Sequence, residues 1–166
     1  RKASLGLQRY LFSSGTFLRS QHIAMYLASD GELDLSFLLS HPKCVNKEFY
    51  LPVVASSSDK QLSFVRYHKK MLFKRNRFFI LEPKYRQAVN IKCIDLVLLP
   101  LVGFDQYGHR LGMGGGFYDT TFSACSSSTQ LVGIAHQIQQ VDQLPVQSWD
   151  ISISQIFSNQ GIIIAS

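Results

Sequence analysis

The sequence has 166 residues, of which 46% are hydrophobic and 17% charged, and these proportions are typical of a folded globular domain. No run approaches the roughly 18 to 20 uninterrupted apolar residues of a membrane span, and the first residues show no signal-peptide pattern. We therefore expect a cytoplasmic protein that does not enter a membrane. Residues 1–90 carry 15 Lys and Arg against six Asp and Glu, whereas residues 91–166 carry two against five. This asymmetry favours an anionic small molecule or a nucleic acid as partner, with the acidic half holding a cation.

The first third of the chain predicts an N-terminal element and one strand. Residues 1–14 have a fragmentary helical pattern, typical of a short helix or arm, and His22–Leu27 is an apolar stretch typical of a strand. Glu32 and Asp34 follow this strand, where a helix from Ser36 to Leu39 is expected to begin. Acids at this place are either helix N-terminal charges or ligand contacts, because open α/β sheets bind ligands at the carboxyl ends of their strands.

A basic cluster follows two further predicted strands, Glu48–Val54 and Leu62–Tyr67. The cluster has six basic residues within twelve, interleaved with aromatic residues: Arg66, Lys69, Lys70, Lys74, Arg75 and Arg77. Three interpretations stay open, namely a solvated basic loop, a binding site for an anionic small ligand, and a nucleic-acid surface.

The most informative stretch runs from Asp95 to Asp119. Its apolar first half, Asp95–Phe104, predicts a strand buried on both faces. Five glycines then occur within the nine residues from Gly108 to Gly116. Glycine permits positive φ and close backbone approach, so consecutive N–H groups can converge on an anion. Neither the P-loop signature nor the dinucleotide fingerprint fits, but Arg110 would add a positive charge and Asp119 a ligand for Mg²⁺ at a helix start.

The remaining segments complete an α/β layered domain. Leu131–Ala135 and Gly161–Ala165 predict strands, and Ile151–Phe157 lacks clear alternation. His136 follows the first of these strands, where a histidine is either a packed or capping residue or a catalyst. His109 and His136 are close to the glycines in sequence, and no role is assigned to either of them. The three cysteines are widely spaced and indicate neither a disulfide framework nor a zinc site: Cys44, Cys93 and Cys125.

The run from Leu99 to Asp119, LPLVGFDQYGHRLGMGGGFYD, closely resembles the 5-formyltetrahydrofolate cyclo-ligase family in its bacterial form. Three shorter segments agree in the right order: Asp30–Asp34, Glu48–Val53, and Leu144–Val146 with Trp149–Asp150. The resemblance runs from about His22 to the C-terminus. It implies a single domain over residues 1–166 with a mostly parallel open sheet flanked by helices (Rossmann-like, or NagB-RpiA-CoA-transferase-like).

The resemblance also implies a reaction. The family converts 5-formyltetrahydrofolate to 5,10-methenyltetrahydrofolate with ATP and Mg²⁺ and releases ADP and phosphate. In the implied mechanism, the formyl oxygen attacks the γ-phosphate of ATP, N10 of the folate closes the ring, and phosphate departs. The substrates are thus ATP and a folate whose glutamate tail is single or extended, and we expect a monomer that binds neither nucleic acid nor membrane.

Site residues follow from the resemblance residue by residue. Arg110 and Tyr118 are implied as catalytic residues, and Asp119 and Asp150 as ligands of Mg²⁺. The implied ATP contacts are Lys2, Arg110, Leu111, Gly112, Met113, Gly114, Gly115, Gly116, Phe117 and Tyr118. The implied folate contacts are Leu27, Glu32, Met113, Gly114, Gly115, Gly116 and Phe117. For Glu32 the family therefore favours a ligand contact, and a carboxylate suits the N–H donor edge of a pterin.

The N-terminus departs from the family pattern, because the arm over residues 1–16 is atypically short. Family members carry a basic N-terminal helix and then a second helix before the first strand. Gly6 stands where another basic residue is expected, and the residues between Ser14 and Phe17 are too few for the second helix. Two other functions stay open: a nucleotide or sugar-phosphate binder without this activity, and a nucleic-acid-binding module that uses the basic cluster.

Overall fold

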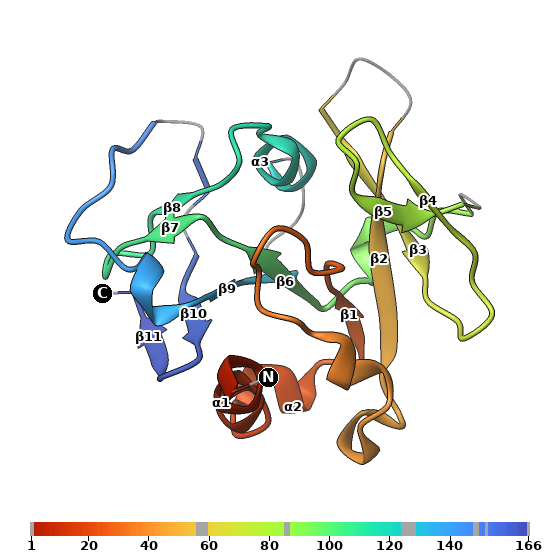
Figure 1. Ribbon diagram of the computed structural model, residues 1–166, viewed down its shortest axis with the longest axis horizontal. Coiled ribbons are helices and arrows are strands. Elements are labelled where there is room, and N and C mark those ends of the chain that lie inside the picture. Colours follow the sequence, from red (N-terminus) through yellow and green to blue (C-terminus); the bar gives the residue numbers. More distant parts are fainter. Residues whose placement is uncertain are drawn as a thin grey trace.

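A seven-stranded sheet forms the centre of the protein in the computed structural model, which describes residues 2–55, 60–84, 87–123, 129–147, 150–151 and 153–165 (Figure 1). The strands lie in the order β11-β10-β9-β6-β1-β2-β3. Their bounds are β1 (His22–Ala24), β2 (Glu48–Val54), β3 (Leu62–Arg66), β6 (Leu96–Pro100), β9 (Gln130–Ala135), β10 (Gln155–Ser158) and β11 (Ile162–Ile164). The inner pairs are parallel, and β3 and β11 at the two edges are antiparallel to their neighbours. The predicted α/β fold with a mostly parallel open sheet is confirmed.

Both faces of the sheet are buried, because successive strand residues point to opposite sides. In β6, Leu96 and Leu98 belong to one core cluster and Val97 and Leu99 to the other. The helices α1 (Lys2–Leu11) and α2 (Gly15–Arg19) contribute to the first cluster, and α3 (Phe117–Phe122) contributes to the second. Figure 1 shows α1 and α2 on one side of the sheet and α3 on the other. A parallel sheet covered on both faces explains the near-continuous apolar composition of its central strand.

Two of the predicted strands end several residues earlier in the structure. The strand predicted over His22–Leu27 ends at Ala24, after which the chain leaves the sheet and the hydroxyl of Tyr26 donates to Leu33 O at 2.7 Å. The prediction of one strand over Asp95–Phe104 was wrong. After β6, Val102 N donates to Leu111 O instead of continuing the main sheet. The chain therefore forms a separate small hairpin of β7 (Gly103–Phe104) and β8 (Arg110–Leu111).

The prediction that no second N-terminal helix is present was also wrong. The short helix α2 is closed at both ends, since the Ser14 side chain accepts from Phe17 N and Lys47 Nζ donates to Phe17 O at 2.9 Å. Packing explains why glycine, and not the expected basic residue, stands at position 6. A Cβ at Gly6 would lie 2.2 Å from the carbonyl oxygen of Asn159, so only glycine lets α1 approach the chain beyond β10 this closely.

The remaining elements are short. A hairpin of β4 (Phe73–Arg75) and β5 (Leu81–Pro83) was not predicted. The helix expected at Ser36 is a single 3-10 turn, η1 (Ser36–Leu39), and three more such turns occur: η2 (Pro42–Cys44), η3 (Ile91–Cys93) and η4 (Gln137–Gln139). Cys44 is buried and Cys93 exposed, and both are free thiols; Cys125 and Trp149 lie outside the described residues. Within the described ranges, no helix has the length and apolar character needed to span a membrane.

Candidate functional site

The order of the strands places the site between β1 and β6, which are neighbours in the sheet. From β1 the chain continues to β2 on one side, whereas from β6 it continues to β9 on the other side. Ligands of open α/β sheets bind at such a switch point, outside the carboxyl ends of the strands. Glu32 follows the end of β1, and the glycines follow the end of β6 through the β7–β8 hairpin.

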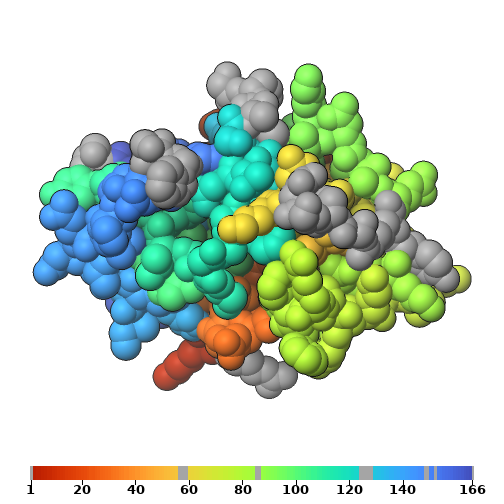
Figure 2. All heavy atoms as spheres, turned by 90° about the horizontal axis from the view of Figure 1, so that it is seen from above, coloured from red at the N-terminus to blue at the C-terminus, as the bar shows by residue number. Residues whose placement is uncertain are grey.

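The residues Gly112–Gly116, here called the glycine loop, connect β8 to α3 and lie near the middle of the face seen in Figure 2. Gly114 and Gly116 have φ of +77° and +64°, a left-handed conformation that other residues adopt only with strain. No backbone N–H from Gly112 to Gly116 donates a hydrogen bond to any residue that the structure describes. N–H groups that have no hydrogen-bond acceptor among the described residues suit an anion such as a phosphate.

An ion pair closes the base of the glycine loop. Arg110 Nη2 lies 2.5 Å from Asp119 Oδ1, and the two side chains are 7% and 26% exposed. Both side chains also hold Ile151, because Arg110 Nη1 donates to its carbonyl oxygen and Asp119 Oδ1 accepts its N–H at 3.2 Å. The neighbour of Ile151 in the chain is Asp150, so these contacts bring the segment that carries Asp150 to the end of the glycine loop.

Asp119 and Asp150 suit a magnesium ion that is shared with a nucleotide. Asp150 Oδ2 accepts the N–H of Gln147 at 2.8 Å, while Asp119 Oδ2 accepts no hydrogen bond from a described residue. In the described part of the chain, no group of three or more His, Cys, Asp and Glu side chains could hold a metal ion. Magnesium is commonly bound by one or two carboxylates together with phosphates and water. Asp119 in the first turn of α3 and Asp150 next to Ile151 would fit that pattern if the glycine loop holds phosphates.

A tight turn presents Glu32 to the site. Asp30 and Gly31 both have left-handed φ, +52° and +84°, and Ser29 N donates to Glu32 Oε2 at 2.9 Å. Burial raises the pKa of Glu32 above its ordinary value, against the hydrogen bond from Ser29 that lowers it. Burial also raises the pKa of Tyr118, and the charge of Glu32 adds to this rise. Glu32 is therefore within electrostatic reach of Tyr118, which directly follows the glycine loop and Phe117.

His136 supports the same turn from the end of β9. Its Nε2 lies 3.1 Å from the carbonyl oxygen of Gly31, and because a carbonyl can only accept, Nε2 carries the hydrogen. A second histidine, His109, has its Nδ1 2.9 Å from Oδ2 of the fully buried Asp105. Burial raises the pKa of Asp105, but hydrogen bonds from Leu144 N, the His109 ring and two further backbone N–H groups outweigh it, and the net pKa lies below the usual range. Both histidines thus hold backbone or buried groups in place.

Other predicted contacts differ in how closely they approach the glycine loop. Leu27 is half-buried after β1 and packs against the core, whereas Met113 is 63% exposed within the loop itself. Lys2 is exposed at the start of α1, a helix that packs against β10. No hydrogen bond or ion pair between described residues joins Lys2 to the glycine loop.

Phe78 lies at the site although it was not among the predicted site residues. Its ring centroid is 5.6 Å from that of Phe117, and the rings meet edge to face at 80°. The contact places residues 76–80, the tip of the β4–β5 hairpin, against the glycine loop. The only signal in the sequence is the interleaving of aromatic and basic residues in the basic cluster. That cluster is divided in space, since Arg66 and Lys69 line a different hollow beside the amino end of β2.

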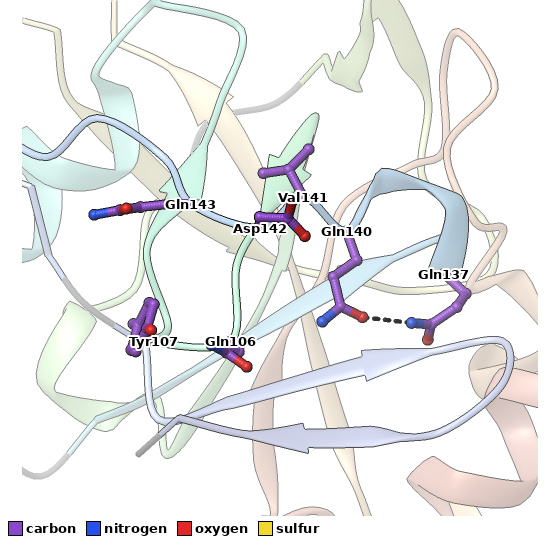
Figure 3. Close-up of a pocket in the computed structure, with 7 residues that line it drawn as sticks. All are labelled: Gln106, Tyr107, Gln137, Gln140, Val141, Asp142 and Gln143. Atoms are coloured by element: carbon purple, nitrogen blue, oxygen red, sulfur yellow. Dashed lines mark hydrogen bonds between the residues drawn. The ribbon is translucent and has the colours of Figure 1, made fainter.

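Two surface hollows lie apart from the glycine loop. The first, with a volume of about 680 Å³, lies between the β7–β8 turn and the loop after η4 (Figure 3). Its lining is mostly uncharged amides, of which Gln137 and Gln140 bond each other at 2.6 Å: Gln106, Tyr107, Gln137, Gln140, Val141, Asp142 and Gln143. The second has a volume of about 370 Å³. Neither is lined by a residue implied to bind ATP, folate or magnesium.

Comparison with known proteins gives a consistent picture. A model of the 5-formyltetrahydrofolate cyclo-ligase family matches residues 1–159. The 5-formyltetrahydrofolate cyclo-ligase of Escherichia coli (strain K12) is 43% identical over 134 residues, which cover 79% of this chain and 74% of that protein. The protein of the same name from Haemophilus influenzae is 38% identical over 141 residues, covering 83% and 75%. The solution structure of Aquifex aeolicus 5,10-methenyltetrahydrofolate synthetase superposes with a TM-score of 0.79 at 30% identity, covering 97% of this chain and 80% of that one.

Proposed function

This chain belongs to the 5-formyltetrahydrofolate cyclo-ligase family, and we propose that it converts 5-formyltetrahydrofolate and ATP to 5,10-methenyltetrahydrofolate, ADP and phosphate in the presence of Mg²⁺. The observation that carries this proposal is the glycine loop. The N–H groups of Gly112–Gly116 donate no hydrogen bond to a described residue. The loop stands between the buried Arg110 side chain and the two acids Asp119 and Asp150. These are the parts that phosphoryl transfer needs, since that chemistry is mostly positioning and charge neutralisation.

The reaction balances without an outside oxidant or reductant. The formyl oxygen on N5 attacks the γ-phosphorus of ATP, the bond to the β-phosphate oxygen breaks, and ADP leaves. N10 then attacks the activated formyl carbon and gives up its proton. The carbon–oxygen bond breaks, and the former formyl oxygen departs within inorganic phosphate.

The chain's own groups bind and orient the reactants. The N–H groups of the glycine loop hold the phosphates and require no reorganisation as charge develops on them. Glu32 accepts hydrogen bonds from the N–H donors of the pterin, and its ionised form suits this role best because the carboxylate only accepts. Tyr118 stays protonated, because burial and the charge of Glu32 both raise its pKa. Asp119 and Asp150 would hold the magnesium ion, which supplies charge neutralisation at the phosphates when it is bound.

The test is a direct assay of the product. The protein is mixed with Mg²⁺, ATP and 5-formyltetrahydrofolate, and the near-ultraviolet absorbance of the methenyl product is followed while ADP release is measured in parallel. We expect equal amounts of product and ADP, and no product when ATP is omitted or replaced by a non-hydrolysable analogue. Binding of ATP without any methenyl product, in the presence of magnesium and folate, would contradict the proposal and leave a nucleotide binder.

A further inference from the structure

The tip of the β4–β5 hairpin forms a wall of the site to which the proposed function assigns no role. Phe78 at this tip contacts Phe117, the first residue of α3 directly after the glycine loop, with ring centroids 5.6 Å apart. In Figure 2 the hairpin residues and the glycine loop are neighbours on the same face of the molecule. A ligand seated on the glycine loop therefore has the hairpin tip within reach.

Hydrogen bonds fix the shape of this tip. The side-chain oxygen of Asn76 accepts from Phe78 N at 2.9 Å and from Ile80 N at 3.2 Å, and Asn76 N donates to Ile80 O at 2.9 Å. Arg75 Nη1 donates to Phe79 O at 2.6 Å, and Phe79 has a left-handed φ of +61°. The Arg75 side chain is thus bound to the backbone of the turn, and these hydrogen bonds together fix the backbone from which Arg77, Phe78 and Phe79 project.

Arg77 is the cation that this turn presents to solvent. Its guanidinium carbon lies 4.9 Å from the centroid of the Phe78 ring, and no carboxylate of a described residue pairs with it. Other members of the basic cluster do have such partners, since Lys74 lies 3.5 Å from Glu82 and Arg66 lies 2.5 Å from Glu48. An arginine that rests on an aromatic ring keeps its planar N–H groups oriented for a carboxylate.

The chemistry of the tip distinguishes between the two anions that reach this site. The phosphates of ATP have the glycine loop, and no aromatic ring lies next to the γ-phosphate in that molecule. In a folate, by contrast, a flat aminobenzoyl ring is joined directly to glutamate, with its carboxylates. The tip offers the same order of groups, because the exposed ring of Phe78 lies beside Arg77 and the exposed Phe79 is the next residue of the turn. We propose that Arg77, together with Phe78 and Phe79, forms the subsite for the aminobenzoyl-glutamate tail of the folate, an inference that rests on the proposed function.

The experiment removes the charge from the protein and the carboxylates from the ligand in turn. Calorimetric titration measures the affinity of wild-type protein and Arg77→Gln for 5-formyltetrahydrofolate, for its triglutamate, and for the corresponding pteroamide, in which an uncharged primary amide replaces the glutamate. We expect Arg77→Gln to weaken binding of the two glutamate-bearing ligands about five- to tenfold, as for a partly exposed bidentate ion pair, and to leave pteroamide binding unchanged. Arg77→Lys should restore part of the affinity.

Two controls decide between explanations. Lys70→Gln removes one positive charge from the same basic cluster away from the tip and should leave all three affinities unchanged. The affinity for ATP is measured on every variant. A loss of ATP affinity in Arg77→Gln, or an equal loss for pteroamide and folate, would overturn the proposal. Because the readout is binding, the result does not depend on turnover, and absence of methenyl product from the wild type would refute the proposed function separately.

Discussion

Replacing Asp119 by asparagine separates its contact with Arg110 from its expected role at the metal. Asparagine has nearly the same shape and keeps an oxygen that can accept the N–H of Ile151, which Asp119 Oδ1 accepts at 3.2 Å. The substitution removes the negative charge that faces Arg110 at 2.5 Å. Since the arginine side chain is only 7% exposed, its charge would stay largely buried without compensation.

The size of the effect follows from this burial. Removing one partner of a fully buried ion pair costs about 3–5 kcal/mol. Asp119 is 26% exposed, and the amide oxygen of asparagine still accepts a hydrogen bond, so we expect Asp119→Asn to lower the free energy of unfolding by about 2 kcal/mol. For a domain of this length, that loss corresponds to a fall of about 4–8 °C in Tm.

The matched control is Asp150→Asn, because the Asp150 carboxylate accepts the N–H of Gln147 at 2.8 Å and pairs with no cation of a described residue. Thermal unfolding followed by circular dichroism gives the stability of both variants, and a magnesium titration of turnover gives their metal requirement. Both variants should need more Mg²⁺, whereas only Asp119→Asn should lose several degrees of Tm. Equal Tm values for the two variants would refute the ion-pair argument, and an unchanged magnesium titration in both would refute the metal assignment.

Three further predictions address the folate and phosphate contacts. Burial raises the pKa of Glu32, so the KM for folate should rise as the pH falls through that pKa while the KM for ATP does not; Glu32→Gln should abolish this pH dependence in paired KM profiles. His136→Ala removes the donor to Gly31 O and should raise the KM for folate about fivefold without changing that for ATP, whereas His136→Gln, which can still donate, should recover part of the loss. Gly114→Ala forces a side chain into a φ of +77°, which costs about 1 kcal/mol and should raise the KM for ATP about fivefold. At Gly112 an added Cβ would meet no atom within 4 Å and φ is not left-handed, so Gly112→Ala should raise the KM for ATP less. Equal effects of the two substitutions would contradict this reasoning.

Local patterns in the sequence were sufficient for the strands whose ends are marked by a change in composition. Glu48–Val54 is β2 with the predicted bounds, and β9 begins one residue before the predicted Leu131. The break after Pro100 could not be predicted, because Leu101, Val102 and Phe104 continue the apolar run. That break depends on the bond from Val102 N to Leu111 O, whose partner is nine residues away in the chain.

The residues of the candidate site also fall into those that local sequence patterns can predict and those whose place depends on contacts between distant segments. The glycine loop and Asp119 were inferred from a motif that is continuous in sequence, whereas Glu32 and Asp150 followed from family resemblance. Phe78 could not be found by either route, since its place depends on how the β4–β5 hairpin packs against a residue 39 positions later. The role of His136 depends likewise on Gly31, 105 residues earlier.

The structure also changes what Arg110 can contribute. The sequence treats it as a positive charge beside the glycines, but its charge is balanced by Asp119 and one of its N–H groups is bound to Ile151 O. Arg110 therefore fixes both ends of the glycine loop more than it adds net charge to it. The loop between those ends contains glycines with left-handed φ, and its N–H groups donate no hydrogen bond to a described residue. Donors held on a fixed base need little reorganisation when a phosphate gains charge, and this is how such a site lowers the barrier to phosphoryl transfer.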